Sequence, residues 1–253
     1  MRIAIKIGYD GTKFNGFAIQ PNRKTVEGEI LNRLIKTKII DDRRKARFQY
    51  AARTDKGVSA LGNVIAFNCK GDAIKAMKKL RDIWIFGYAF VRNDFNPRNC
   101  KSKIYRYYLY DIGYDFKKMQ QSAKLFEGKH NFSNFARIDS RNPIRKIDSI
   151  KIKKEGRIIK IDFEGKSFLW NQIRRMMAAI IKAARNEVEI NEIEKALNGE
   201  RKNFGLAPAE NLVLYDIKYD FNFEKILPEE IFVKSSIFKD ALILSKDAII
   251  YHE

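Results

Sequence analysis

A short polar segment, Arg53–Ala60, lies between two runs of strand-forming residues and dictates where the chain must turn. The first run is Arg47–Ala52 and the second is Asn63–Phe67. Two strands separated by so few residues need a tight connection, and the glycine in the segment suits one. The segment therefore predicts a loop that displays Asp55 beside Arg53. The same Asp-Lys-Gly sequence is also ordinary turn chemistry, so the loop alone predicts no function.

The rest of the chain alternates strand and helix patterns, with no short-period repeat or low-complexity segment. Beyond the runs beside Asp55, alternation predicts strands over Arg2–Tyr9, Tyr88–Arg92, Lys103–Asp111, Lys146–Lys154, Arg157–Phe163 and Asn211–Tyr219, with closing strand pieces in Ile237–Tyr251. Helical spacing predicts helices from the N-cap Thr25, over Asp72–Asp82, over Asp115–Phe126, and from a Ser167 cap to Arg185. The simplest partition is an α+β protein with an N-terminal domain, residues 1–100, and a C-terminal domain, residues 101–253.

The charge of the chain points to a polyanionic partner. Fifty Lys and Arg residues against 31 Asp and Glu residues give a formal net charge of +19. A basic surface binds nucleic acid because each phosphate that it neutralises releases a condensed counterion. A Lys-rich proteome or attraction to anionic lipid would produce the same excess of charge, and composition alone does not distinguish these two origins from nucleic-acid binding.

Several classes of site are poorly supported by the composition. Two cysteines, Cys69 and Cys100, imply no disulfide framework and fit a reducing cytoplasm. The two histidines, His130 and His252, lie far apart and lack Cys partners at ligand spacing, so we expect no zinc site. The N-terminus is no signal peptide and no apolar run approaches transmembrane length, so we expect a cytoplasmic protein without a membrane partner.

An enzyme with this composition would depend on carboxylates, Tyr, Lys and Arg. No glycine-rich phosphate loop of the P-loop type is present, so nucleotide hydrolysis is poorly supported. An aspartate beside an arginine keeps a low pKa and stays ionised. Asp55 is therefore a candidate nucleophile or charge stabiliser.

An aromatic run and a pair of arginines are further candidates. In a strand, Tyr105 and Tyr107 share one face while Arg106 lies on the other. Most such tyrosines pack a sheet, but one beside a cation can stack on an RNA base, and the run does not distinguish these roles. Arg174 and Arg175 interrupt an apolar helix pattern, so one of them falls near the buried stripe and needs an anionic partner. A structural and a catalytic ion pair are equally compatible with this pattern.

Eight segments, in order, resemble the tRNA pseudouridine synthase A family. They are Tyr9–Phe17 with Gln20 (YDGxxYxGWxxQ in the family), Thr25–Glu27 (T/S-V-Q/E), Ala52–Ala60 (GRTDxGVHA), Asp94–Arg98 (DFHAR), Lys103–Tyr107 (K/R-x-Y-x-Y), Gly128–Phe135 (GxHDFxxF), Phe168–Arg174 (FLxxMVR) and Ala207–Leu212 (APAxGL). Each motif alone is weak, whereas eight in register are specific. Departures from the family pattern occur at Phe17, Ala52, Ser59, Asn131 and Asn211. The serine at 59 argues against an essential acid or base at that position.

The resemblance implies a role for each matched site residue. Asp55 would be the catalytic aspartate, attacking the uridine or stabilising its detached form while the glycosidic bond moves from N1 to C5. Tyr105 would stack on the target base and is a candidate base for the C5 proton. Arg174 would pair with Asp55, and Arg53 would help to extrude the target nucleotide. Extrusion is required because the reacting bond is inaccessible while the base is stacked.

The resemblance also implies a fold and partners. The fold would be two ferredoxin-like α+β halves that form a continuous antiparallel sheet, with helices packed on it and a cleft between the halves. The enzyme would be a cytoplasmic homodimer that acts on uridines 38 to 40 of the tRNA anticodon arm, without a metal or another cofactor. Two alternatives are a non-catalytic RNA-binding module of ferredoxin-like halves and a basic scaffold or membrane-surface protein. The first would have no reason to keep the Arg53–Asp55 pair in a turn, and the second explains the charge alone.

Overall fold

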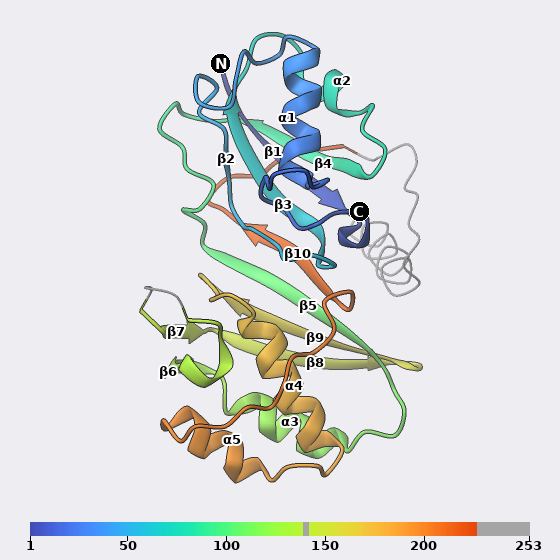
Figure 1. Cartoon of the computed structure of the whole chain (residues 1–253), viewed down its shortest axis with the longest axis vertical. Coiled ribbons are helices and arrows are strands. Elements are labelled where there is room, and N and C mark those ends of the chain that lie inside the picture. The colour runs from blue at the N-terminus through green and yellow to red at the C-terminus, as the bar shows by residue number, and fades with distance from the viewer. Residues whose placement is uncertain (139–141, 227–253) are drawn as a thin grey trace. The chain divides into compact units, whose positions relative to one another are not determined.

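The computed structural model describes residues 1–138 and 142–226 (Figure 1). The chain divides into two compact units. Unit 1 comprises Met1–Lys101 together with the described residues from Val213 onward, and unit 2 comprises Ser102–Leu212. The sequence partition kept residues 101–253 in one domain, whereas here the chain returns to unit 1 after residue 212. The physical reason is strand pairing, because residues 213 and 214 pair with the central strands of unit 1.

Unit 1 is a mixed sheet with two helices. Its elements are β1 (Arg2–Tyr9), the 3-10 helix η1 (Gly11–Lys13), α1 (Val26–Lys36), β2 (Gln49–Tyr50), β3 (Ser59–Asn68), α2 (Ala73–Met77), β4 (Ile83–Phe90), β10 (Leu212–Lys218) and β11 (Glu224–Lys225). The strand order is β11-β4-β1-β3-β10. The strand β10 pairs with the start of β3, and β2 pairs with β3 nearer to its end, at Ile65 and Ala66. All pairs are antiparallel except β3 with β10.

The core of unit 1 follows from the periodicities of its sequence. Ile3, Ile5 and Ile7 alternate along β1 and are at most 2% exposed. Val26, Ile30 and Leu34 recur at helical spacing on α1 and are fully buried. The predicted strand Arg2–Tyr9 and the predicted helix start at Thr25 are both confirmed, since the Thr25 hydroxyl accepts the Gly28 N–H at 3.3 Å.

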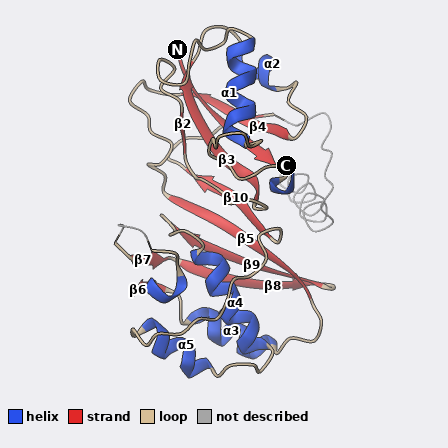
Figure 2. Cartoon of the chain, viewed as in Figure 1, coloured by secondary structure: helices blue, strands red, loops and turns tan. Residues whose placement is uncertain are grey.

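Unit 2 combines an antiparallel sheet with three helices. Its elements are β5 (Ser102–Tyr110), α3 (Phe116–Lys124), β6 (Gly128–Asn131), the 3-10 helix η2 (Ser133–Phe135), β7 (Ile144–Ile147), β8 (Ser149–Glu155), β9 (Ile158–Gly165), α4 (Gln172–Ala184) and α5 (Ile190–Leu197). The strands β5, β9 and β8 pair antiparallel in that order, and β6 pairs with β7 as a separate ribbon. Figure 2 shows α3, α4 and α5 gathered together, and α3 contacts both other helices. The predicted α+β class with antiparallel pairing and packed helices is confirmed.

Several elements differ from the sequence predictions. The helix predicted over Asp72–Asp82 is only Ala73–Met77, because the strand that follows begins at Ile83 and pairs with β1, well before the predicted start at Tyr88. The helix α5 was not predicted. The predicted Ser167 cap is wrong, since α4 begins at Gln172 after Asn171 in the left-handed conformation. The strand pieces predicted in Ile237–Tyr251 lie outside the described residues.

Candidate active site

The Asp55 loop joins β2 to β3 in unit 1, as the sequence predicted. Arg53 and Lys56 are exposed, Asp55 is half-buried, and Thr54 is buried between them. The Val58 N–H donates to the Asp55 carbonyl at 3.1 Å, which closes a tight turn. Gly57 has a φ of 86° in this turn, a conformation that side chains with a Cβ rarely adopt. The turn therefore keeps the Asp55 side chain half-buried, between the buried Thr54 and the exposed Lys56.

A chain of buried hydrogen bonds anchors the Asp55 loop from below. The Tyr9 hydroxyl lies 2.8 Å from the Thr54 hydroxyl and accepts the Asn63 side-chain amide at 3.2 Å. The same amide donates to the Ala52 carbonyl at 3.0 Å. Burial raises the pKa of Tyr9, against the opposing effect of these hydrogen bonds, so its hydroxyl stays protonated. The N-terminal end of the loop, at Ala52 and Thr54, is thus tied to one buried tyrosine and one buried asparagine.

The η1 segment contacts the other side of the loop through its backbone. The Gly11 carbonyl accepts the Gly57 N–H at 3.3 Å, and the Gly11 N–H donates to the Ser59 hydroxyl at 3.0 Å. A Cβ on Gly11 would lie 2.1 Å from the Val58 carbonyl oxygen, so only glycine allows this approach. Ser59, a departure from the family pattern, is fully buried and serves as a backbone hydrogen-bond partner. A structural role at position 59 fits the expectation that it is not an acid or base.

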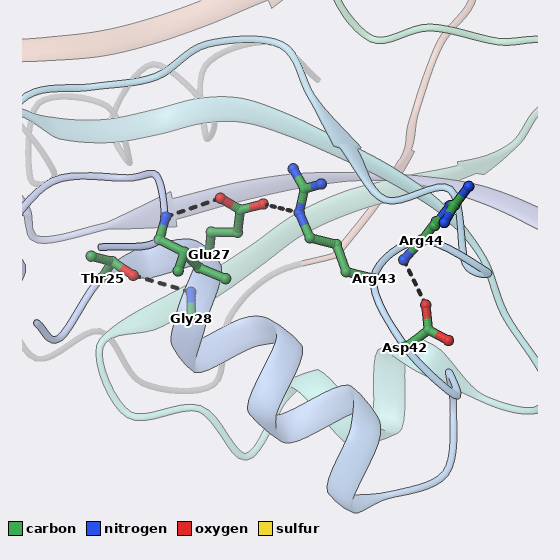
Figure 3. A network of polar contacts seen from close by, with 7 residues as sticks. Thr25, Glu27, Gly28, Asp42, Arg43 and Arg44 are labelled. Atoms are coloured by element: carbon green, nitrogen blue, oxygen red, sulfur yellow. Dashed lines mark hydrogen bonds and ion pairs between the residues drawn. The ribbon is translucent and has the colours of Figure 1, made fainter. Parts of the chain in front are cut away.

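The start of α1 supports the loop through a buried carboxylate (Figure 3). Glu27 is 2% exposed, and its carboxylate accepts the Ile19 N–H at 3.1 Å and the Arg43 Nε–H at 2.8 Å. These bonds hold the segment that contains Phe17, whose N–H donates to the Thr54 carbonyl at 3.0 Å. The Phe17 ring is fully buried, so the phenylalanine at this position fills a core site. Glu27 thus holds the segment that contains Phe17 and Ile19, and this segment in turn contacts the Asp55 loop.

The strand β10 completes the support of the loop. Its residues Val213 and Leu214 pair in parallel with Ser59 and Ala60, the last two residues of the predicted loop segment. All four residues are buried. A part of the chain remote in sequence therefore fixes where the Asp55 loop enters β3.

Tyr105 lies on β5 in unit 2, opposite Phe163 of β9. It is half-buried, and its ring meets the Phe168 ring edge-to-face with centroids 5.3 Å apart. Tyr107 on the same face is fully buried and donates to the Pro208 carbonyl at 3.1 Å. Burial is the main cause that raises the pKa of Tyr107. The aromatic run thus divides: Tyr107 packs the core, and Tyr105 keeps part of its surface accessible.

Arg174 lies in the first turn of α4, also in unit 2. Its Nε–H donates to the Ala207 carbonyl at 2.7 Å, and its Nη1 donates to the Asn171 side-chain oxygen at 3.5 Å. Its own carbonyl accepts the Ala207 N–H at 3.1 Å. These two acceptors are neutral oxygens, and a guanidinium has five N–H donors. Arg174 and Arg175 are both half-buried.

The predicted site residues are divided between the two units. Arg53 and Asp55 lie together in unit 1, and Tyr105 and Arg174 belong to unit 2. Sequence reasoning missed the anchoring roles of Tyr9, whose motif was recognised only as a family signature, and of Asn63, which no local pattern marks.

Over residues 1–138 and 142–226, no three His, Cys, Asp or Glu side chains gather where they could hold a metal ion. Within the same residues, every helix is too short or too polar to cross a lipid bilayer.

Comparison with known proteins decides the family. Residues 122–220 match the family model described as tRNA pseudouridine synthase. The tRNA pseudouridine synthase A of Thermococcus sibiricus is 45% identical over 264 residues, covering 96% of this chain and 99% of that protein. The chain belongs to the tRNA pseudouridine synthase A family. Those of Pyrococcus furiosus (44% identity, 87% of this chain and 84% of that protein) and Methanothermobacter thermautotrophicus (39%, 86% and 81%) agree.

Membership of the family makes the chain an isomerase that acts on tRNA, as the sequence resemblance predicted. A solved complex of Cbf5, Nop10 and Gar1 also matches, at 14% identity and a TM-score of 0.32 over 71% of this chain and 54% of that one. That likeness is too low to support any argument.

Proposed function

We propose that this isomerase converts uridine to pseudouridine at positions 38 to 40 of the tRNA anticodon stem-loop, with Asp55 as its nucleophile. The observation that carries the proposal is the Asp55 loop itself, where Thr54 and Ser59 are buried and hydrogen-bonded while Asp55 is half-buried. Such a loop holds a carboxylate at a defined position with part of its surface open to a substrate. A turn with no chemical role would not need this number of buried polar partners.

The reaction is an isomerisation, and its atoms balance within the substrate. The bond from C1′ of the ribose to N1 of uracil breaks, the base turns, and a bond from C1′ to C5 forms. The C5 proton leaves and N1 gains a proton, so neither an oxidant nor a nucleotide is consumed. Asp55 attacks the uridine or stabilises its detached form, because an ionised carboxylate can do either.

The other residues act on the same substrate. Tyr105 stacks on the target base and is a candidate base for the C5 proton, and its half-buried position in the structure supports contact with a base. Arg174 pairs with Asp55 through guanidinium donors beyond those used by Ala207 and Asn171. Arg53, which is exposed, helps to extrude the nucleotide from the stem. The enzyme works in the cytoplasm as a homodimer.

Tritium release tests the proposal directly. Anticodon-arm transcripts carrying C5-tritiated uridine at position 38, 39 or 40 are incubated with the full chain, and released tritium is counted. Wild type is expected to release tritium from at least one transcript. Asp55→Asn keeps the size of the side chain but not its charge, and we expect its rate to fall by about a thousandfold or more.

Asp41→Asn is a matched control, because Asp41 is an exposed carboxylate paired with Lys70. It should keep the wild-type rate. An absence of release from all three transcripts would overturn the anticodon-arm assignment. Release that survives in Asp55→Asn would remove Asp55 from the mechanism.

A further inference from the structure

An exposed tryptophan and arginine form a stacked pair on unit 2. The chain contains two tryptophans. Trp84 is 5% exposed within β4, whereas Trp170 is 41% exposed in the segment between β9 and α4. The guanidinium carbon of Arg137 lies 4.1 Å from the centroid of the Trp170 ring system, which is close for a cation–π contact. One face of the indole is thus covered by a cation, and much of the remaining surface faces solvent.

The backbone holds this pair in place. The Arg137 N–H donates to the Trp170 carbonyl at 2.8 Å in an isolated antiparallel bridge. The neighbours Ala136 and Leu169 are 5% exposed, so buried residues fix both sides of the bridge. Gln172, which is fully buried, accepts the Leu169 N–H at 2.8 Å. An aromatic side chain that is exposed yet anchored loses little conformational entropy when a ligand stacks on it.

The same segment contacts the residue proposed to receive the target base. Phe168, two residues before Trp170, meets the Tyr105 ring edge-to-face. Two residues span at most about 7 Å of chain. Proteins that bind single strands place successive bases on neighbouring aromatic side chains, with Arg or Lys for the backbone. A nucleotide next to the target base is therefore a fitting occupant of the Trp170 surface.

We propose that Arg137 and Trp170 form a stacking site for one unpaired tRNA nucleotide that neighbours the target uridine. That the ligand is a tRNA nucleotide beside the target rests on the proposed function. That Arg137 and Trp170 hold it rests on the cation–π contact between them. The guanidinium of Arg137 carries a positive charge that can attract a phosphate of the same nucleotide. The net charge of +19 favours a polyanion over a neutral or basic protein surface.

Intrinsic fluorescence tests the site without any need for turnover. The Trp84→Phe variant of the full chain has Trp170 as its single tryptophan, and it is titrated with an anticodon-arm transcript. We expect RNA to quench the Trp170 fluorescence to saturation and to protect Trp170 from acrylamide. The midpoint of the quenching curve should equal the midpoint of RNA binding measured by filter binding. If Trp84→Phe does not fold, the difference between wild type and Trp170→Phe gives the same signal. Emission and acrylamide access that stay unchanged at saturating RNA would overturn the proposal.

Affinity measurements distinguish stacking from charge. Trp170→Leu should weaken RNA binding about tenfold and leave the salt dependence of binding unchanged. Arg137→Gln should reduce the slope of log affinity against log salt by about one. Under turnover, Trp170→Leu should raise KM with an unchanged kcat, because the contact is present before and during the reaction.

A second cation–π pair in unit 2 provides the matched control. Arg185 lies 5.6 Å from the Tyr114 ring, and Tyr114→Leu should leave RNA affinity at the wild-type value. Equal losses in Tyr114→Leu and Trp170→Leu would overturn a specific site. So would a Trp170→Leu variant that changes the oligomeric state in sedimentation but not the affinity, since the surface would then contact protein. A wild type that releases no tritium yet quenches with RNA would overturn the proposed function and leave this site standing.

Discussion

The Asp55 loop and the start of α4 both present proposed site residues, but different bonds hold them in place. The Asp55 loop is fixed by buried side chains around it, namely Thr54, Ser59 and Asn63. At the start of α4, the guanidinium of Arg174 is itself one of the tethers, because it binds the Ala207 carbonyl. In the Asp55 loop, the residues that anchor the loop differ from the residue proposed to act on the substrate. At the start of α4, Arg174 both anchors the backbone and is the residue proposed to act in the site. Substitutions should therefore separate stability from activity only in the Asp55 loop.

The substitution with the largest expected effect on stability removes the close approach of Gly11 to the Asp55 loop. Gly11→Ala would place a Cβ 2.1 Å from the Val58 carbonyl oxygen, so the η1 segment must move. We expect a loss of about 3 kcal/mol in the free energy of unfolding, together with loss of tritium release. Gly113→Ala is the control: its φ is 93° but no atom lies within 4 Å, so backbone strain alone should cost about 1 kcal/mol. Equal losses in urea denaturation would contradict the steric account.

Arg174→Lys tests whether tether and chemistry coincide in α4. Lysine keeps the charge but cannot reproduce the Nε–H bond to Ala207 in the same geometry. We expect both a lower free energy of unfolding, by about 1.5 kcal/mol, and a reduced rate of tritium release. Asp55→Asn should lose the rate alone. If Arg174→Lys is as stable as wild type in urea, the contrast between the two regions is wrong.

Two buried tyrosines allow the two units to be compared by one substitution. Tyr9→Phe leaves the Thr54 hydroxyl and the Asn63 amide each without one partner, and should cost about 2 kcal/mol. Tyr107→Phe removes the hydrogen bonds to the Pro208 carbonyl and to the Asn211 side chain, and it should cost about 1 kcal/mol because the Pro208 bond is only partly buried whereas those of Tyr9 are buried. Thermal or urea unfolding of both variants checks the order. The reverse order would show that the hydrogen-bond chain below the Asp55 loop is not its main anchor.

The same tyrosines predict a loss of stability in alkali. Burial raises the pKa of both Tyr9 and Tyr107 above the ordinary value of 10.0. The folded state then keeps protons that the unfolded state loses, so the full stability is present below pH 10 and falls as the pH rises further. Each group should contribute a slope of about 1.4 kcal/mol per pH unit. Unfolding series between pH 9 and 11.5 should therefore show a shallower decline in Tyr9→Phe and in Tyr107→Phe.

The smallest effect concerns the charge of Glu27. Glu27→Gln keeps an oxygen for the Ile19 N–H and weakens only the pairing with Arg43, whose side chain is 53% exposed. Solvent screens that pair, so the change should cost about 0.5 kcal/mol and leave kcat unaltered. Glu27→Ala removes the acceptor of the Ile19 N–H and the partner of Arg43, and should cost about 2 kcal/mol. Similar costs for the two variants in urea would mean that the charge, not the hydrogen bond to Ile19, fixes this segment.

Local patterns in the sequence predicted the elements whose causes are local. The alternation of Arg2–Tyr9 and the Thr25 cap depend on neighbouring residues, and both predictions are confirmed. The N-cap of α4 was predicted at Ser167, four residues before the observed N-cap Asn171, and in the intervening segment the Trp170 carbonyl accepts the Arg137 N–H. The roles of Asp55, Tyr105 and Arg174 stay predictions. Their structural supports include Asn63 and β10, which are tied to the loop by contacts that no local pattern encodes.

The pairing of β10 with β3 has a consequence for how the protein is made. Domains generally fold as units, N-terminal first, while the chain is being synthesised. Here unit 2 is complete before Val213 and Leu214 exist, whereas the Asp55 loop waits for these two residues to reach Ser59 and Ala60. The unit that the ribosome begins first is therefore finished last. A nascent or truncated chain that lacks β10 would keep the signature of the enzyme without its completed active loop.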